Sequence, residues 1–209
     1  MTEARSIRVL IVEDHPIVRL GLRRALEQEG FQVCGEALAV AEAVLCVERD
    51  APDLVTTDLS LGAEDGLDLV RRLSRTHPRL PVLVYSMFED AAHIERALRA
   101  GASGYITKGE AFDVLPGALR TCLAGGRYLS PIAERTRTAA AEARAGLASL
   151  SGQERQVYDL LGQGGAIAAI AGELELSPRT IESYCVRIQA KLGLDGMKEL
   201  RRQAAENPY

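Results

Sequence analysis

Residues 10–16 read LIVEDHP, and this stretch decides the fold of the first part of the chain. An apolar run stops abruptly there at two adjacent carboxylates, Glu13 and Asp14. The run predicts a strand that is buried on both faces, as in a parallel sheet. Two like charges repel, and the end of a buried strand has no structural need for them. The pair therefore indicates a functional site at the end of this strand.

Strand and helix signals alternate outward from this stretch. Short runs rich in β-branched residues predict five strands, with the sequences IRVLIV, FQVCGEA, DLVTTD, PVLVYS and SGYIT. Amphipathic helical segments fall between them, as in PIVRLGLRRALEQEG. Five β–α units in order predict a five-stranded, doubly wound parallel sheet of the flavodoxin-like kind, with helices on both faces. The site of such a sheet lies at the carboxyl ends of its strands, where the strand order reverses.

The remainder of the chain has a different pattern. Residues 126–148 are rich in Ala and Arg and have little apolar face, which indicates a linker with helical propensity. The pattern after this segment is all-helical, and a Ser-Pro pair and a tight turn favour a helix-turn-helix unit of four short helices. The predicted division is a first domain at 1–125, a linker at 126–148 and a small all-α domain at 149–209.

Composition and charge narrow the class of protein. The 209 residues include no run near the roughly 18 apolar residues of a membrane span, so a cytoplasmic protein without membrane contact is expected. The cysteines form no CxxC pair, and we expect reduced thiols. The net charge is −4, and the segment from Ser151 onward has seven positive and eight negative side chains. This charge balance argues against nucleic-acid binding.

The ends of the first, third, fourth and fifth predicted strands have polar residues with related chemistry. The third strand ends at Asp58, so three carboxylates would converge with Glu13 and Asp14. Hard oxygen ligands in that number suit Mg²⁺. Ser86 ends the fourth strand and Lys108 follows the fifth. Acids, a metal, a lysine and a hydroxyl around one aspartate are what phosphoryl transfer to a carboxylate requires.

The segments EDHP, DLVTTDLSLGAEDGLDLV, VLVYSMFED and GASGYITK, in this order, resemble the receiver domain of two-component response regulators over residues 6–125. The resemblance implies that Asp58 is the phosphoacceptor for a histidine kinase. It also implies that Asp14 and Asp58 bind Mg²⁺ directly, that Glu13 binds through water, and that the backbone carbonyl of Ser60 completes the protein ligands.

The same resemblance assigns a switch. Lys108 would hold a phosphoryl oxygen, Ser86 would move toward the phosphoryl group, and Tyr105 would turn inward as the switch aromatic. The loop departs from the family pattern, because Leu61 and Gly62 stand where Met-Pro is common. Loss of the proline predicts a less rigid loop.

The segment LSGQERQVYDLLGQGGAIAAIAGELELSPRTIESYCVRIQAKLGL resembles the LuxR-type helix-turn-helix of NarL/FixJ-like regulators. The third helix would then enter the major groove of promoter DNA. The residues predicted to face bases are Glu182, Ser183 and Val186, and those predicted to contact phosphates are Arg179, Arg187 and Lys191. Residues 166–169 read AIAA where polar residues are common in the family, which predicts weak binding by a single unit.

These patterns lead to one hypothesis and two alternatives. The hypothesis is a transcription regulator that forms homodimers on phosphorylation, with no enzymatic activity beyond self-phosphotransfer and autodephosphorylation at Asp58. One alternative is a receiver that signals through protein contacts while its DNA-binding unit has weakened. Another is a Mg²⁺-dependent aspartyl-phosphate phosphohydrolase, but such enzymes usually have Asp-x-Asp on the first strand, and this chain has Glu-Asp-His.

Overall fold

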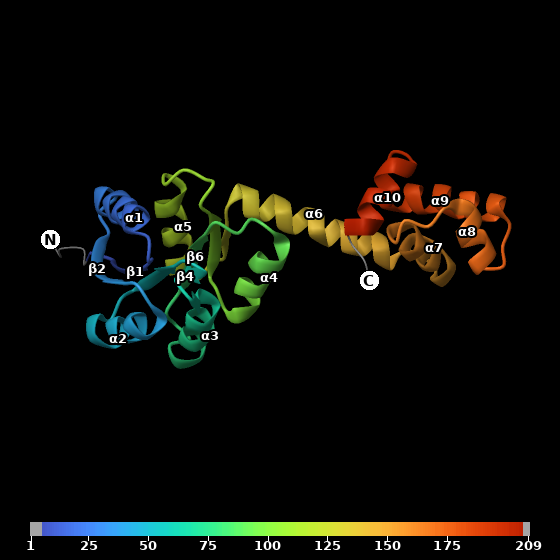
Figure 1. Ribbon diagram of the computed structural model, residues 1–209. Coiled ribbons are helices and arrows are strands. Elements are labelled where there is room, and N and C mark those ends of the chain that lie inside the picture. Colours follow the sequence, from blue (N-terminus) through green and yellow to red (C-terminus); the bar gives the residue numbers. More distant parts are fainter. Residues whose placement is uncertain (1–5, 207–209) are drawn as a thin grey trace. The chain divides into compact units, whose positions relative to one another are not determined.

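The computed structural model describes residues 6–206, and the outermost ends of the two predicted domains lie outside the described residues. The chain divides between Thr138 and Ala139 into two compact units, an α/β unit and a helical unit (Figure 1). No helix in the described part of the chain is long and apolar enough to cross a membrane.

The α/β unit is built on one parallel sheet with strand order β2-β1-β3-β6-β7-β8. The strands are β1 (Arg8–Val12), β2 (Gln32–Ala37), β3 (Leu54–Thr57), β6 (Val82–Ser86), β7 (Gly104–Thr107) and β8 (Tyr128–Leu129). The predicted doubly wound fold is confirmed, but the predicted count of five strands is wrong by one. Strand β8 is short and comes from the segment predicted to be linker, where it pairs with β7 and forms the edge of the sheet.

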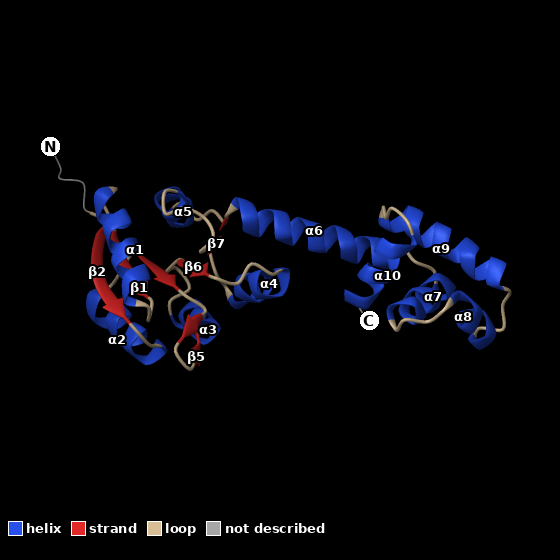
Figure 2. Ribbon diagram, turned by 45° about the horizontal axis from the view of Figure 1, so that its top comes forward, coloured by secondary structure: helices blue, strands red, loops and turns tan. Residues whose placement is uncertain are grey.

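Helices cover both faces of this sheet (Figure 2). They are α1 (Pro16–Gln28), α2 (Val40–Asp50), α3 (Gly66–Thr76), α4 (Ala91–Ala100) and α5 (Val114–Leu123). Side chains of a strand alternate between faces. Val9 and Ile11 accordingly pack with α1 and α5, whereas Leu10 and Val12 pack with α2, α3 and α4. The apolar run of β1 is therefore buried on both faces, as its sequence predicts.

The helical unit contains the second predicted fold. Its helices are α7 (Gly152–Gly162), α8 (Ile167–Glu173), α9 (Pro178–Leu192) and α10 (Met197–Glu206), preceded by α6 (Pro131–Ala148). Ser151 and Glu154 form the capping box of α7, and the Ser177 side chain accepts from the Thr180 amide at the start of α9. Tyr158 and other side chains of all four helices fill a separate hydrophobic core.

The segment predicted to be a linker is ordered at both ends. Ala133 of α6 is buried in the core of the α/β unit, and Leu147 packs against the core of the helical unit. A single helix thus contributes to both cores. The four cysteines are free, as expected, with Cys34 half-buried and the others buried.

Candidate functional site

The three predicted acids meet at the carboxyl ends of two neighbouring strands. Strand β1 lies beside β3 with Val12 opposite Thr57, and the Asp58 amide donates to the Val12 carbonyl at 3.0 Å. This register places Glu13, which directly follows β1, next to Asp58, which directly follows β3. Glu13 is fully buried and Asp58 is 3% exposed. Two carboxylates with so little contact with water require positive charge nearby.

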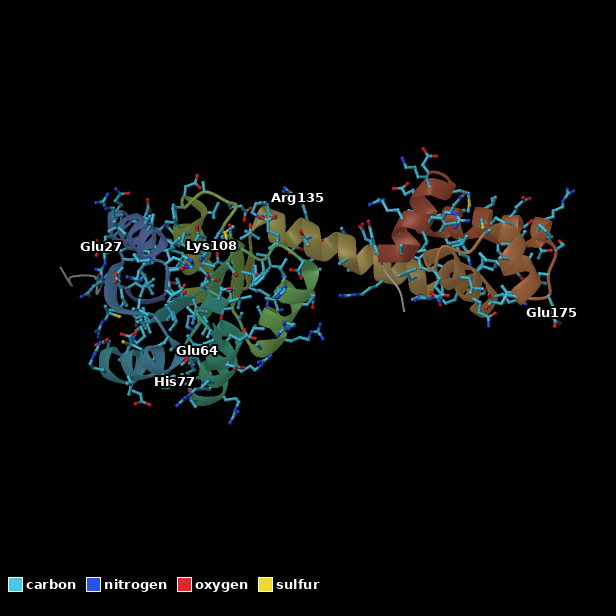
Figure 3. All side chains as sticks on the ribbon, in the orientation of Figure 1. Glu27, Glu64, His77, Lys108, Arg135 and Glu175 are labelled. Atoms are coloured by element: carbon cyan, nitrogen blue, oxygen red, sulfur yellow. The ribbon has the colours of Figure 1, made fainter. Side chains whose placement is uncertain are left out.

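Lys108 supplies that charge. It directly follows β7, and its amide donates to the Ser86 carbonyl at 2.7 Å, which fixes where its side chain begins. Its Nζ donates to Glu13 Oε2 at 2.8 Å and to Asp58 Oδ2 at 2.6 Å. Figure 3 shows Lys108 among the side chains of the α/β unit. One buried ammonium thus joins the ends of three strands through two short, charge-assisted hydrogen bonds.

Asp14 is held by a different donor. The Gly62 amide donates to Asp14 Oδ2 at 2.9 Å, and Gly62 has a φ of +62°. Gly62 lies in the turn between two short antiparallel strands, β4 (Ser60–Leu61) and β5 (Glu64–Asp65). A proline could provide neither the N–H nor the positive φ. The Leu-Gly departure therefore adds a hydrogen bond to Asp14, and the loop contains an antiparallel strand pair. Its lower rigidity stays a prediction.

His15 joins the cluster, and the sequence analysis missed it. Its Nδ1 lies 2.8 Å from Asp14 Oδ1 and 3.3 Å from Glu13 Oε1. Ligand atoms of His15 and the three acids all lie within 4.8 Å of one another. His15 has no histidine or cysteine at metal-ligand spacing in the sequence, so no metal-binding motif indicates it. The available signal was the position of His15 directly after the two acids, because a residue at that place also reaches the strand end.

The electrostatics of the site are strongly negative. Burial, followed by the charges of Glu13 and Asp58, raises the pKa of the neighbouring Tyr85 to about 12. Lys108 Nζ lies 5.8 Å from the centre of that ring. Three carboxylates against one ammonium leave two negative charges. This charge and the hard oxygen ligands fit one divalent cation.

The predicted switch residues lie behind the site. Ser86 is fully buried, and its Oγ has no hydrogen-bond partner among the described residues. Tyr105 is also fully buried, and its hydroxyl donates to the Phe88 carbonyl at 2.8 Å. Burial raises the pKa of Tyr105. The Ser86 hydroxyl lies near enough to lower this pKa in part, but it does not have the geometry of a hydrogen bond to Tyr105. A buried hydroxyl without a partner is costly unless a ligand satisfies it.

Helix α9 separates a buried face from an exposed one. Ile181, Tyr184, Cys185 and Ile188 face the core, whereas all six predicted DNA-contact residues are exposed; these are Arg179, Glu182, Ser183, Val186, Arg187 and Lys191. Val186 is 63% exposed and lies on this same exposed face. The exposed face could therefore contact the floor of a groove.

Lys191, the sixth residue, has another environment. Its Nζ donates to Glu154 Oε2 at 2.7 Å and to the Ser149 carbonyl at 3.0 Å. The hydrogen bond from Lys191, with help from the Ser151 backbone, lowers the pKa of Glu154 to about 2. The structure thus places Lys191 in the packing of α9 on α7, where its ammonium is already engaged.

These features define a class of protein. A doubly wound sheet with an acid–lysine site where its strand order reverses is a domain suited to accept a phosphoryl group. A helix-turn-helix unit follows it on the same chain. The fold and the site together define a two-domain regulator, with an input domain that precedes an output domain.

Comparison with known proteins identifies the family. Residues 9–120 match the response regulator receiver domain, and residues 148–204 match the luxR family of bacterial regulatory proteins. The chain is 34% identical to the response regulator UvrY of Escherichia coli over 203 residues, which cover 95% of the chain and 93% of UvrY. The chain belongs to the two-component response regulators of the NarL/FixJ type, which act in transcription regulation.

Solved structures of RcsB resemble the whole chain. RcsB of Salmonella typhimurium, described for its DNA interaction, has a TM-score of 0.68 and 27% identity, and the match covers 98% of this chain and 100% of RcsB. A structure of two RcsB dimers bound to two parallel DNAs has a TM-score of 0.61 and 28% identity, with 96% and 98% covered.

Proposed function

We propose that Asp58 accepts a phosphoryl group from a sensor histidine kinase and that this modification controls dimerisation and promoter binding. The observation that carries the proposal is the buried Lys108 ammonium, which bridges Asp58 and Glu13 at 2.6 and 2.8 Å. It places a cation beside the Asp58 carboxylate, where the oxygens of an incoming phosphoryl group would lie.

The acidic residues would hold one Mg²⁺. Asp14 and Asp58 would bind it directly, Glu13 through water and Ser60 through its backbone carbonyl. Ser60 fits this role because it begins β4 as an exposed residue, two positions after Asp58. The bound ion would supply charge neutralisation to the phosphoryl oxygens. A divalent ion would neutralise the two remaining negative charges, whereas one further ammonium group would neutralise only one of them.

The chain's own groups have separate roles in the transfer. An Asp58 carboxylate oxygen attacks phosphorus, so that a P–O bond forms while the P–N bond of the kinase phosphohistidine breaks. The Leu59 amide donates to Asp58 Oδ1 at 2.6 Å and orients the carboxylate. Lys108 then bonds a phosphoryl oxygen. The unpartnered Ser86 hydroxyl can donate to another, and its movement would alter the packing around Tyr105.

The output would be sequence-specific DNA binding. The exposed face of α9 would enter the major groove, with Glu182, Ser183 and Val186 toward bases and with Arg179 and Arg187 toward phosphates. Lys191 stays in the proposal only as a residue that positions α9. Two units on two half-sites would multiply the weak affinity of each. RcsB, which resembles this chain, has been solved as dimers bound to DNA, and this supports the arrangement.

Molar mass by light scattering tests the proposal. The full chain with Mg²⁺ is compared with and without beryllofluoride, an aspartyl-phosphate mimic, beside Asp58→Ala. A mass increase that Asp58→Ala abolishes is the expected result. An equal response in both proteins would refute the role of Asp58.

The second candidate function, signalling through protein contacts alone, is favoured by the near-balanced charge of the helical unit. Retention of the beryllofluoride-treated protein on promoter-sized DNA, and its loss with rising salt, separates the two functions. Assembly without any DNA retention would favour the second.

A further inference from the structure

A hollow of about 520 Å³ lies between helices α3 and α4 of the receiver domain. It is lined by Arg71, Ser74, Arg75, Arg96, Arg99 and Ala100. These residues lie in the C-terminal halves of both helices. Each helix runs back against the strand that precedes it, so the hollow lies at the end of the sheet opposite the acid cluster. We call it the arginine cleft.

The four arginines form two rows across this cleft. Arg71 and Arg75 are one turn apart on α3, and Arg96 and Arg99 are one turn apart on α4. All four are exposed. The two helices together have five arginines and only two acidic residues, in a chain whose net charge is −4. Positive charge is thus concentrated on one face of an acidic protein.

The arginines are only partly neutralised by the protein itself. Arg71 pairs with Asp68 at 2.7 Å, and Arg96 reaches Asp65 only at 3.5 Å. The Arg99 guanidinium donates to a neutral backbone carbonyl at 3.4 Å, and Arg75 pairs with no described residue. Guanidinium groups that surround one hollow repel each other unless an anion lies between them. Their planar forks match phosphate oxygens in pairs.

The walls of the cleft indicate the kind of anion. Apart from the arginines, only Ser74 and Ala100 line it, so neither an aromatic ring nor a large apolar side chain is present to stack on a base. A site for a small nucleotide ligand would need such a surface. Phosphates spaced along a backbone need only the arginine rows. The seven positive and eight negative side chains from Ser151 onward leave the helical unit without a strong field of its own.

We infer that the arginine cleft binds the phosphate backbone of nucleic acid without regard to sequence. The receiver domain would then contribute electrostatic affinity that the DNA-binding unit lacks. Such contacts release counterions, and each lowers the logarithm of the binding constant by about 0.9 per tenfold rise in salt.

The test is a salt titration of the full chain on a fluorescent duplex of arbitrary sequence, followed by anisotropy. Arg75→Gln/Arg99→Gln removes one arginine from each row, two positive charges in all, and Arg24→Gln/Arg127→Gln removes two charges from exposed positions outside the cleft. The salt slope is the fall in the logarithm of the binding constant for each tenfold rise in salt. We expect the cleft variant to reduce this slope by about 1.8 and the control variant to leave it nearly unchanged.

Equal slopes for the two variants would overturn the inference. Binding of poly-glutamate that the cleft variant abolishes, with DNA binding intact, would overturn it as well, because the cleft would then recognise acidic protein. The light-scattering response to beryllofluoride should be the same in wild type and both variants. A failure of the arginine cleft is therefore distinguishable from a failure of the Asp58 switch.

Discussion

The Lys108→Met substitution tests the electrostatics of the proposed phosphoacceptor site most directly. It keeps an unbranched apolar stem of similar length and removes the ammonium that lies 2.8 Å from Glu13 and 2.6 Å from Asp58. The side chains of these acids are only 1% and 3% exposed, so water cannot replace the lost charge. Removing one partner of a buried ion pair typically costs about 3–5 kcal/mol. We expect about 3 kcal/mol for this site, because Asp58 can still accept the Leu59 amide.

The assay is urea unfolding at pH 7, with and without Mg²⁺. Saturation at about 100 times the dissociation constant adds about 2.7 kcal/mol to any state that binds the ion. Mg²⁺ should therefore stabilise Lys108→Met more than wild type, since the variant's acids attract it without a competing ammonium. Adding Asp58→Asn should also recover part of the loss. The exposed Lys198→Met is the matched control. A loss under about 1 kcal/mol that neither Mg²⁺ nor Asp58→Asn alters would refute the reasoning.

Other substitutions test separate features. A Cβ at Gly66 would lie 2.0 Å from the backbone carbonyl oxygen of Asp58, so Gly66→Ala should abolish the beryllofluoride response, whereas Gly152→Ala, with open space around it, should retain that response. Gly62→Pro removes the amide that orients one acid and should weaken Mg²⁺ binding about tenfold by calorimetry; unchanged affinity would show that the amide is not needed. The pKa of Glu154 is lowered to about 2, so its stabilising contribution is complete above about pH 4.5 and is lost as pH falls toward 2. In Lys191→Met the free energy of unfolding should depend less on pH between about 4.5 and 2. An unchanged pH dependence in this range would contradict the role of Lys191 in lowering the pKa of Glu154.

Local patterns in the sequence were sufficient for the elements and for most of the site. The apolar run before Glu13 can be satisfied only by burial on both faces, and that requirement predicts a central parallel strand. Acids at strand ends then converge in any sheet of this topology, so Asp58 and Lys108 could be placed from the order of the elements. The capping box at Ser151 was equally visible, because it depends on residues three positions apart.

Tertiary structure decided the features that depend on pairing between distant segments. Strand β8 is too short to have a pattern of its own and exists because the edge of β7 offers it hydrogen bonds. The Gly62 bond to Asp14 requires a backbone conformation that no composition reveals, and the Lys191 bond to Glu154 joins positions 37 residues apart. The arginine cleft likewise needs two helices to pack side by side. The periodicity of a sequence indicates which face of a helix or strand is buried. Which charged side chains of two different elements lie opposite each other depends on how those elements pack.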